Sequence, residues 1–280
     1  MLSAVALFAL MDAGLKLLSP HYPPLQVATL RGLASLPLVL VWVLCTIKPR
    51  ALLRVHWPLH LLRGALGIGM MFGFVYGLRT MPLSTAYAIT FVAPMLVTAM
   101  AVPFLGEKVG PRRWTAIVIG LVGVLVVLRP TGQGMATVGG LAILIAAICY
   151  AASAITVRLL AQRDSSQSMV FWFLILLSLG AGTMAAPNWL PLQAGDLWVI
   201  AGIGVSGSLA QVALTEAFRR GEASLIAPLE YSALVWGVGL DLALWHVLPD
   251  GVTWIGAGII VASGLYLLGR EKVHAETEHP

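Results

Sequence analysis

The sequence predicts an all-α membrane protein in which ten transmembrane helices form two inverted five-helix repeats. Three observations lead to this fold class. Hydrophobic residues make up 59% of the 280 residues and charged residues 10%, with a mean hydropathy of +0.91, whereas a soluble domain carries roughly 25% charged residues. Apolar runs of near-spanning length, roughly 20 residues each, follow one another along the chain. The second half of the chain also repeats features of the first half.

The ten apolar runs are separated by short segments that contain proline, glycine or charged residues. In chain order, the expected spans cover residues 2–18, 25–47, 58–78, 83–105, 114–129, 138–160, 168–186, 196–218, 224–246 and 252–269. Helix-breaking residues stand at 20–24, 48–50, 110–111, 129–132, 187–188 and 249–251. The first run contains Asp12 and Lys16 and lacks both a basic n-region and a small-residue cleavage site. We therefore expect a retained helix rather than a signal peptide.

The internal repeat is visible when the chain is shifted by about 140 residues. Residues 79–84 then fall on residues 219–224, and Trp114 falls on Trp254. Each half has five spans, an odd number, so the second half enters the membrane upside down relative to the first. Inverted repeats are common in secondary transporters, with the substrate held where the halves meet. We expect a first repeat over 1–132, a second over 133–269 and a polar cytoplasmic tail over 270–280.

The distribution of basic residues sets the expected orientation, because cytoplasmic connections are enriched in Lys and Arg. With the N-terminus inside, the basic residues of the cytoplasmic connections are Lys48, Arg50, Arg54, Lys108, Arg112, Arg113, Arg158, Arg163, Arg219, Arg220, Arg270 and Lys272. Only Arg79 and Arg129 lie in connections on the other side. Both termini are thus expected on the cytoplasmic side of a bacterial inner membrane. This topology accounts for the net charge of +5 and leaves no basic face for nucleic acid.

Sequence motifs for catalysis and cofactor binding are absent. The chain has no Walker A, HExxH or GxSxG pattern and no Cys/His cluster with metal-ligand spacing. Residues 202–207 spell GxGxxG, but they lie inside an apolar span with no preceding strand, so close helix packing is the better interpretation. We therefore expect no enzyme activity, no cofactor and no metal. Transport without an ATP-binding cassette has to use a gradient or exchange.

Polar and aromatic residues inside the spans are candidates for a substrate cavity. An ionised side chain at mid-bilayer costs roughly 2.5–3.5 kcal/mol even on insertion scales, so it needs a partner or an aqueous cavity. The candidates are Asp12, Lys16, Tyr76, Tyr87, Phe91, Tyr150, Gln211, Glu230, Tyr231 and Trp236. Asp12 and Lys16 share a helix face and could instead form a pair that only fixes packing. For Arg31, Arg63 and Glu216, snorkelling or local pairing is the favoured interpretation.

Small residues and prolines are candidates for packing or gating. Gly69, Gly73 and Gly77 recur every four residues and let another backbone approach. This stripe indicates either plain helix packing or a sliding face beside the substrate path. Pro94 and Pro228 lie within the corresponding fourth and ninth spans, where each removes a backbone hydrogen bond and can kink its helix.

Several motifs together resemble the EamA-type transporters of the drug/metabolite transporter superfamily. They are residues 77–86, 91–94, 104–110, 112–114 with the glycine-rich span to 130, 227–231, Trp254 and 264–271, and Lys16 and Arg31 fit the same pattern. The chain looks most similar to YddG-type exporters of amino acids and related metabolites. The resemblance implies ten helices, cytoplasmic termini and a central cavity. One departure is His246-Val247, where the family pattern has Gly-Glu after the ninth span.

The expected function is a secondary-active transporter that moves small organic metabolites, most simply amino acids, by alternating access. Export is the favoured direction. A small-molecule substrate, the lipid bilayer and a proton or exchanged solute are its expected partners. Alternatives are an importer of S-adenosylmethionine or a similar metabolite, a lipid flippase, a channel, and a membrane enzyme. The last lacks any visible set of nucleophile, base and metal.

Overall fold

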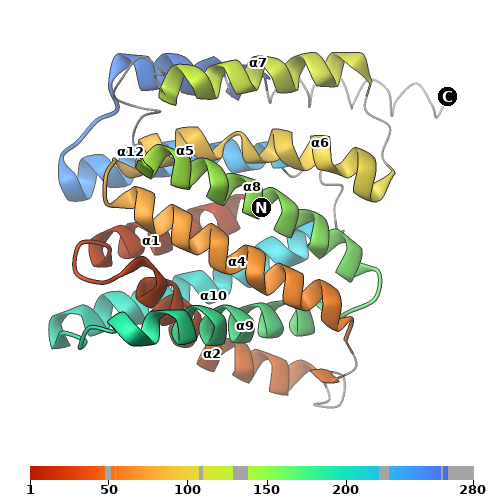
Figure 1. Ribbon diagram of the computed structural model, residues 1–280, viewed down its shortest axis with the longest axis vertical. Coiled ribbons are helices and arrows are strands. Elements are labelled where there is room, and N and C mark those ends of the chain that lie inside the picture. Colours follow the sequence, from red (N-terminus) through yellow and green to blue (C-terminus); the bar gives the residue numbers. More distant parts are fainter. Residues whose placement is uncertain are drawn as a thin grey trace.

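The computed structural model describes residues 1–47, 52–53, 55–106, 110–128, 138–220, 227–259 and 261–263. All regular structure in these residues is helical (Figure 1). The α-helices are α1 (Leu2–Leu18), α2 (Pro24–Thr46), α4 (Trp57–Leu78), α5 (Leu83–Thr90), α6 (Ala93–Leu105), α7 (Pro111–Leu128), α8 (Val138–Ala161), α9 (Ser166–Ala185), α10 (Leu197–Arg220) and α12 (Ala233–Leu240). Shorter turns are η1 (Ala186–Asn188), η2 (Ala194–Asp196), η3 (Ala227–Ser232) and η4 (Asp241–Trp245), and a final helix covers Gly251–Ser263. The prediction of an all-α protein is confirmed.

Six helical segments of the described chain are long and apolar enough to cross a bilayer. They are Pro24–Thr46, Trp57–Leu78, Leu83–Leu105, Val138–Ala161, Ser166–Asn188 and Ala194–Arg220. Helix α1 has 17 residues, slightly short of the roughly 20 that a perpendicular span requires. The six long apolar segments identify the protein as a multi-pass membrane protein. The boundary expected at 132/133 and the tail expected at 270–280 lie outside the described residues.

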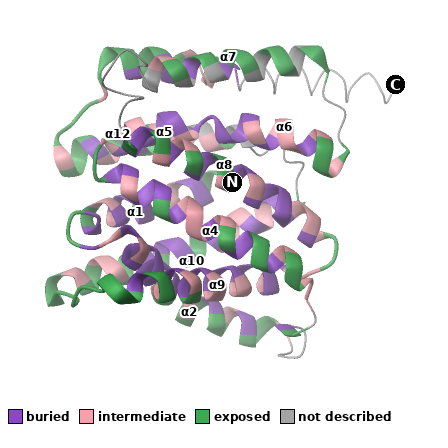
Figure 2. Ribbon diagram, in the orientation of Figure 1, coloured by how far each residue is buried: buried purple, intermediate pink, exposed green. Residues whose placement is uncertain are grey.

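The outer surface of the bundle is apolar, as a lipid-facing surface must be. Figure 2 shows buried residues concentrated in the interior and exposed residues on the outer helices. Among the exposed side chains are Leu44, Leu61, Val118, Ile145 and Leu179, each 55–63% exposed. A soluble monomer rarely leaves so many large apolar groups uncovered. Lipid tails cover such a surface without cost.

The expected fourth span, 83–105, is divided into α5 and α6 at Phe91 and Val92. Pro94 lies in the first turn of α6. Its ring lacks an N–H donor and would clash with the carbonyl of the residue four positions earlier, so the α-helix cannot run through this point unchanged. The expected fourth span therefore consists of two separate helices, α5 and α6.

The expected ninth span, 224–246, also departs from a continuous α-helix. Its described part is the 3₁₀ turn η3, the short α-helix α12 and the π-helical turn η4. Single π-helical turns are rare and occur often at functional sites. Here the π turn includes the buried Asp241. Residues 221–226 lie outside the described part, and so do the side chains of Pro228 and Tyr231.

Two helix pairs enclose the centre of the bundle. Helix α4 packs along α8, and α1 packs along α10, while α2 and α9 pack against each other beside them (Figure 1). The glycine stripe of α4 lies in the first of these contacts. A Cβ atom at Gly73 would overlap the carbonyl oxygen of Ala142, and one at Gly77 would overlap the side chain of Ile143. Glycine is therefore required for the close approach of α4 and α8.

Candidate functional site

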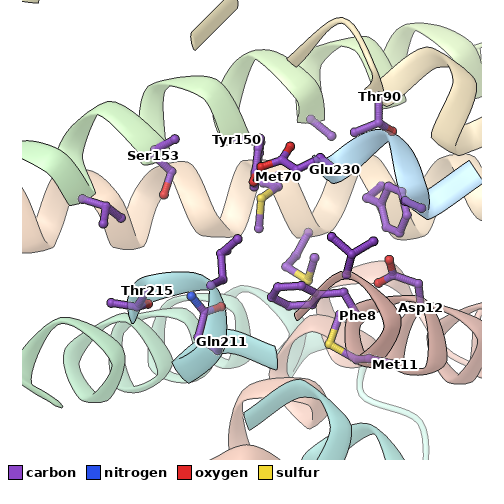
Figure 3. A pocket seen from close by; sticks show the side chains of 18 of the residues that line it. Phe8, Met11, Asp12, Met70, Thr90, Tyr150, Ser153, Gln211, Thr215 and Glu230 are labelled. Carbon is purple, nitrogen blue, oxygen red and sulfur yellow. Dashed lines mark hydrogen bonds between the residues drawn. The ribbon is translucent and has the colours of Figure 1, made fainter. Parts of the chain in front are cut away.

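A cavity of ≈ 180 Å³ lies between the α4–α8 pair and the α1–α10 pair. This is about ten times the space that one water molecule requires. Figure 3 shows Met70 and Tyr150 on one side of the space and Phe8, Met11 and Gln211 on the other. Most of the lining is apolar, with methionine and phenylalanine side chains contributed by several helices. The lining therefore contains only a few polar side chains.

One carboxylate of the cavity belongs to Glu230, which η3 places directly before α12. The hydroxyl of Tyr150 on α8 donates a hydrogen bond of 2.7 Å to Glu230 Oε1. The two side chains meet in the cavity in Figure 3. The Glu230 side chain therefore reaches α8 from a 3₁₀ turn that precedes α12, not from a regular α-helix.

The second carboxylate belongs to Asp12, near the middle of α1. The hydroxyl of Tyr87 on α5 donates a hydrogen bond of 2.8 Å to Asp12 Oδ2. Asp12 is 8% exposed and Tyr87 6% exposed. The Tyr87 ring stacks on Phe74 of α4 with the ring centroids 6.3 Å apart. Each cavity carboxylate is thus held by one tyrosine from a neighbouring helix.

Two arginines also line the cavity, Arg31 from α2 and Arg63 from α4. Both are 2% exposed. Their guanidinium carbons lie 5.9 and 4.8 Å from the centroid of the same ring, Phe173 of α9. The cavity therefore contains two cationic and two acidic side chains in apolar surroundings.

Six of the sequence-predicted candidates line the cavity: Asp12, Tyr87, Phe91, Tyr150, Gln211 and Glu230. The lining does not include Lys16, Tyr76 or Trp236. Tyr76 stacks on Phe72, with centroids 6.0 Å apart, and Trp236 is 46% exposed on the outer surface. The side chain of Tyr231 lies outside the described part.

Lys16 is held away from the cavity by an ion pair. Its Nζ lies 2.8 Å from Asp241 Oδ1 and 4.1 Å from the centroid of the Trp245 ring. Asp241 also accepts hydrogen bonds from the backbone N–H groups of Leu83 and Ser84, at 3.1 and 2.7 Å. The pairing of Lys16 with Asp12 on one helix face does not occur, since each has a partner on another helix. Asp241 thereby joins α1, the start of α5 and η4.

Gly69, Gly73, Gly77 and Pro94 lie around the cavity rather than in its lining. A Cβ at Gly69 would lie 3.2 Å from Cys149 Sγ on α8, so Gly69 belongs to the same contact as Gly73 and Gly77. Pro94 lies at the break between α5 and α6. Pro228 lies in η3, two residues before Glu230.

Several cavity residues were not among the sequence candidates, most notably Arg31, Arg63 and Phe173. The signal for Arg63 was its spacing: Met70 and Phe74 follow it on the same face of α4 and all three line the cavity. Arg31 fits the EamA-type pattern and the general rule that charged groups inside a span mark functional sites. Phe173 could not be distinguished in sequence from other aromatic residues of an apolar helix.

No group of three or more His, Cys, Asp or Glu side chains in the described residues is arranged to hold a metal ion. The cavity polar groups are instead two arginines, two carboxylates, hydroxyls and one amide. Such a set suits reversible binding of an organic solute by hydrogen bonds and charge.

Two segments of the chain, residues 1–129 and 137–269, match the EamA-like transporter family. The chain belongs to this family, and it is a transporter of the drug/metabolite transporter superfamily rather than an enzyme. The resemblance found in the sequence motifs is thereby confirmed at the level of the family.

Curated relatives share this role but differ in substrate. The chain is 26% identical to the pseudopaline exporter CntI of Pseudomonas aeruginosa, over 95% of this chain and 93% of the relative. It is 31% identical to an S-adenosylmethionine uptake transporter of Rickettsia conorii, over 79% of this chain and 74% of the relative. It is 29% identical to a riboflavin transporter of Vibrio cholerae, over 99% and 94%. A solved crystal structure with 19% identity superposes with a TM-score of 0.70 over 94% of this chain and 93% of the other, and supports the fold.

Proposed function

We propose that the protein is a secondary-active transporter that moves small organic metabolites of the amino-acid type across a bacterial inner membrane by alternating access, with export as its direction. The observation that carries the proposal is a cavity between the helix pairs that combines apolar walls with acidic and basic side chains. A solute with an amine, a carboxylate and a hydrocarbon part matches this combination. The acidic residues Glu230 and Asp12 would bind the amine.

The proposed architecture is ten spans in two inverted repeats, 1–132 and 133–269, followed by a cytoplasmic tail over 270–280. Helix packing supports it. In the proposed repeat α1 corresponds to α8, α2 to α9 and α4 to α10. The α4–α8 contact then corresponds to the α10–α1 contact, and the α2–α9 contact corresponds to itself. The tyrosine–carboxylate bonds support it as well. In one half Asp12 on the first span meets Tyr87 on the fourth, and in the other Tyr150 on the sixth meets Glu230 on the ninth.

The proposed orientation places both termini in the cytoplasm. The excess of basic residues in the corresponding connections supports it. Contacts between connections are compatible with this assignment. Tyr22 donates a hydrogen bond of 2.7 Å to Asp196 on the proposed outer side, and His60 lies 2.9 Å from Asp164 at the proposed inner end.

The proposed gate on the outer side is the cluster around Asp241. It closes the end of the cavity beyond Asp12, where Lys16, η4 and the start of α5 meet. The Arg79 side chain adds hydrogen bonds to the carbonyl oxygens of Ser19 and Tyr22 on the same side. Towards the other side the lining extends to Met1 and Phe218. Alternating access would require the Asp241 cluster to separate while the α4–α8 and α1–α10 pairs tilt. The break at Pro94 and the 3₁₀ turn that contains Pro228 provide places for bending.

The proposal is tested by counterflow in proteoliposomes. Purified full-length protein is reconstituted with unlabelled amino acid inside, and labelled amino acid is added outside, with and without a proton gradient. Accelerated uptake of at least one amino acid into protein-containing vesicles, absent from empty vesicles, is the expected result. Equal uptake into both types of vesicle across an amino-acid panel would refute the proposal.

A second candidate function is uptake of S-adenosylmethionine. The observation that favours it is the 31% identity to the Rickettsia conorii transporter named for this activity. The same vesicles, loaded with unlabelled S-adenosylmethionine and offered labelled S-adenosylmethionine, distinguish this candidate from a carrier confined to ordinary amino acids.

A further inference from the structure

Arg31 and Arg63 form one side of the cavity around a shared aromatic ring. Arg31 comes from α2 and Arg63 from α4, and the ring of Phe173 on α9 lies next to both guanidinium groups. All three residues line the cavity. Two cations from different helices therefore face one space. An arginine that only anchors a helix end extends towards the lipid headgroups instead.

Neither guanidinium group forms an ion pair with any described carboxylate. Arg31 donates from Nε to Met11 Sδ at 3.1 Å and from Nη2 to Gln211 Oε1 at 3.4 Å. Arg63 donates from Nη1 to the carbonyl oxygen of Met169 at 2.8 Å. The nearby acids Asp12 and Glu230 accept hydrogen bonds from tyrosines instead. Asp12 interacts electrostatically with Arg31 without pairing with it directly, and no described carboxylate pairs with Arg63.

Buried donor atoms on this side also lack partners. Within the described residues, Arg31 Nη1, Arg63 Nε and Thr215 Oγ1 have no hydrogen-bond partner. Thr215 is 1% exposed and lies in the cavity lining beside Gln211 (Figure 3). A buried donor without a partner is costly, and an unpaired buried charge is more so. An anionic ligand with several acceptor lone pairs would satisfy these donors.

We propose that Arg31 and Arg63, with Phe173 beneath them and Thr215 and Gln211 at their side, bind the carboxylate of a zwitterionic organic solute. This inference rests on the proposed transport function and deepens it by assigning the two poles of the substrate. The carboxylate lies at the arginines and the ammonium lies towards Glu230 and Asp12. The planar guanidinium fork matches a carboxylate in two hydrogen bonds, which an ammonium group of lysine cannot reproduce. The apolar lining receives the hydrocarbon part.

The test uses three probes that share one hydrocarbon skeleton. L-Leucine has both charges, 4-methylpentanoate has only the carboxylate, and 3-methylbutylamine has only the ammonium group. Each probe is titrated against purified full-length protein in detergent, and the ligand-dependent rise of the unfolding temperature gives its affinity. The wild type is expected to be stabilised by L-leucine and by 4-methylpentanoate. Failure of both carboxylates to stabilise the wild type would overturn the inference.

Arginine variants then assign the effect to the proposed groups. Arg31→Gln and Arg63→Gln are each expected to weaken binding of 4-methylpentanoate by about tenfold or more, the loss typical of one hydrogen bond to a charged group. Arg63→Lys keeps the positive charge, so it serves as a second variant in case Arg63→Gln does not fold. It is expected to bind 4-methylpentanoate more tightly than Arg63→Gln does. The control is Arg220→Gln, because Arg220 pairs with Glu216 outside the cavity and its side chain is 81% exposed. Unchanged carboxylate affinity in both glutamine variants and in Arg63→Lys would overturn the inference.

Counterflow separates this inference from the transport proposal. If labelled leucine shows counterflow but 4-methylpentanoate does not compete with it, the carboxylate assignment is wrong and the transport proposal stands. If no amino acid shows counterflow but the arginine variants lose carboxylate binding, the assignment stands and the transport proposal fails.

Discussion

Lys16 and Asp241 lie 225 residues apart in the chain, and their side chains join at 2.8 Å. Asp241 is fully buried, and the same carboxylate accepts two backbone hydrogen bonds at the start of α5. One acidic side chain therefore connects the first span, the fourth span and the π-helical turn. Because these elements belong to both halves of the chain, the contact is well placed to report their relative movement.

Removal of one partner of this pair is expected to destabilise the protein strongly. Loss of one charge from a buried pair typically costs about 3–5 kcal/mol, because the other charge remains buried without compensation. Asp241→Asn and Lys16→Gln should each lower the unfolding temperature in detergent, and the double variant should lose less than the sum of the two. Glu216→Gln is the control, since its exposed pair with Arg220 should contribute at most about 1 kcal/mol. Equal unfolding temperatures of Asp241→Asn and Glu216→Gln would show that the Lys16–Asp241 pair does not stabilise the protein.

The contact of α4 with α8 predicts a large effect of one methyl group. In Gly73→Ala the new Cβ meets the carbonyl oxygen of Ala142, and backbone of a packed helix cannot give way as a side-chain end can. Overpacking of this kind typically costs about 1–3 kcal/mol. Gly202→Ala on α10 is the matched control because nothing lies within 4 Å of its added Cβ, and alanine favours the helix by up to about 1 kcal/mol. Thermal unfolding should rank the variants Gly202→Ala, wild type, Gly73→Ala, from most to least stable, and the reverse order would contradict the packing role.

Much of the helical organisation follows from the local sequence. The expected span 2–18 coincides with α1, and the spans from 25, 58 and 138 begin within one residue of α2, α4 and α8. Long apolar runs and proline-containing breaks are local signals, so sequence reasoning can locate them. Pro94 indicated a disturbed fourth span. The π-helical turn at Asp241 depends on contacts with Lys16 and α5, which no local pattern contains.

The cavity was predictable only in part for the same reason. A carboxylate or tyrosine inside an apolar span is conspicuous, and Asp12, Tyr87, Tyr150 and Glu230 all line the cavity. Sequence reasoning could not separate them from Lys16, whose direction is decided by Asp241. Nor could it bring Arg31 and Arg63 to one ring, because that arrangement depends on how three helices pack.

Glu230 is expected to control recognition of the ammonium group. In Glu230→Gln the side chain keeps its shape but loses its negative charge, so binding of 3-methylbutylamine and of L-leucine should weaken about tenfold or more. Affinity for 4-methylpentanoate should stay within about twofold, because that probe has no ammonium group. Tyr150→Phe removes the hydrogen bond at 2.7 Å without changing the charge and should have a smaller effect. The concentration dependence of leucine counterflow measures the consequence for transport. Unaltered counterflow in Glu230→Gln would refute a role for this carboxylate.

The proposed topology predicts opposite accessibility for two connections of the second half. Gly195 lies between α9 and α10, is exposed and has open space around an added Cβ, whereas Gln162 lies exposed between α8 and α9. A background with Cys45→Ala and Cys149→Ala removes the two native cysteines, which are free. In intact spheroplasts, Gly195→Cys should react with a membrane-impermeant maleimide, and Gln162→Cys should react only after the membrane is opened. These two connections flank α9, so a single crossing of the bilayer requires that they differ. Labelling of Gln162→Cys but not Gly195→Cys in intact spheroplasts would reverse the orientation, and with it the side on which the Lys16–Asp241 gate lies.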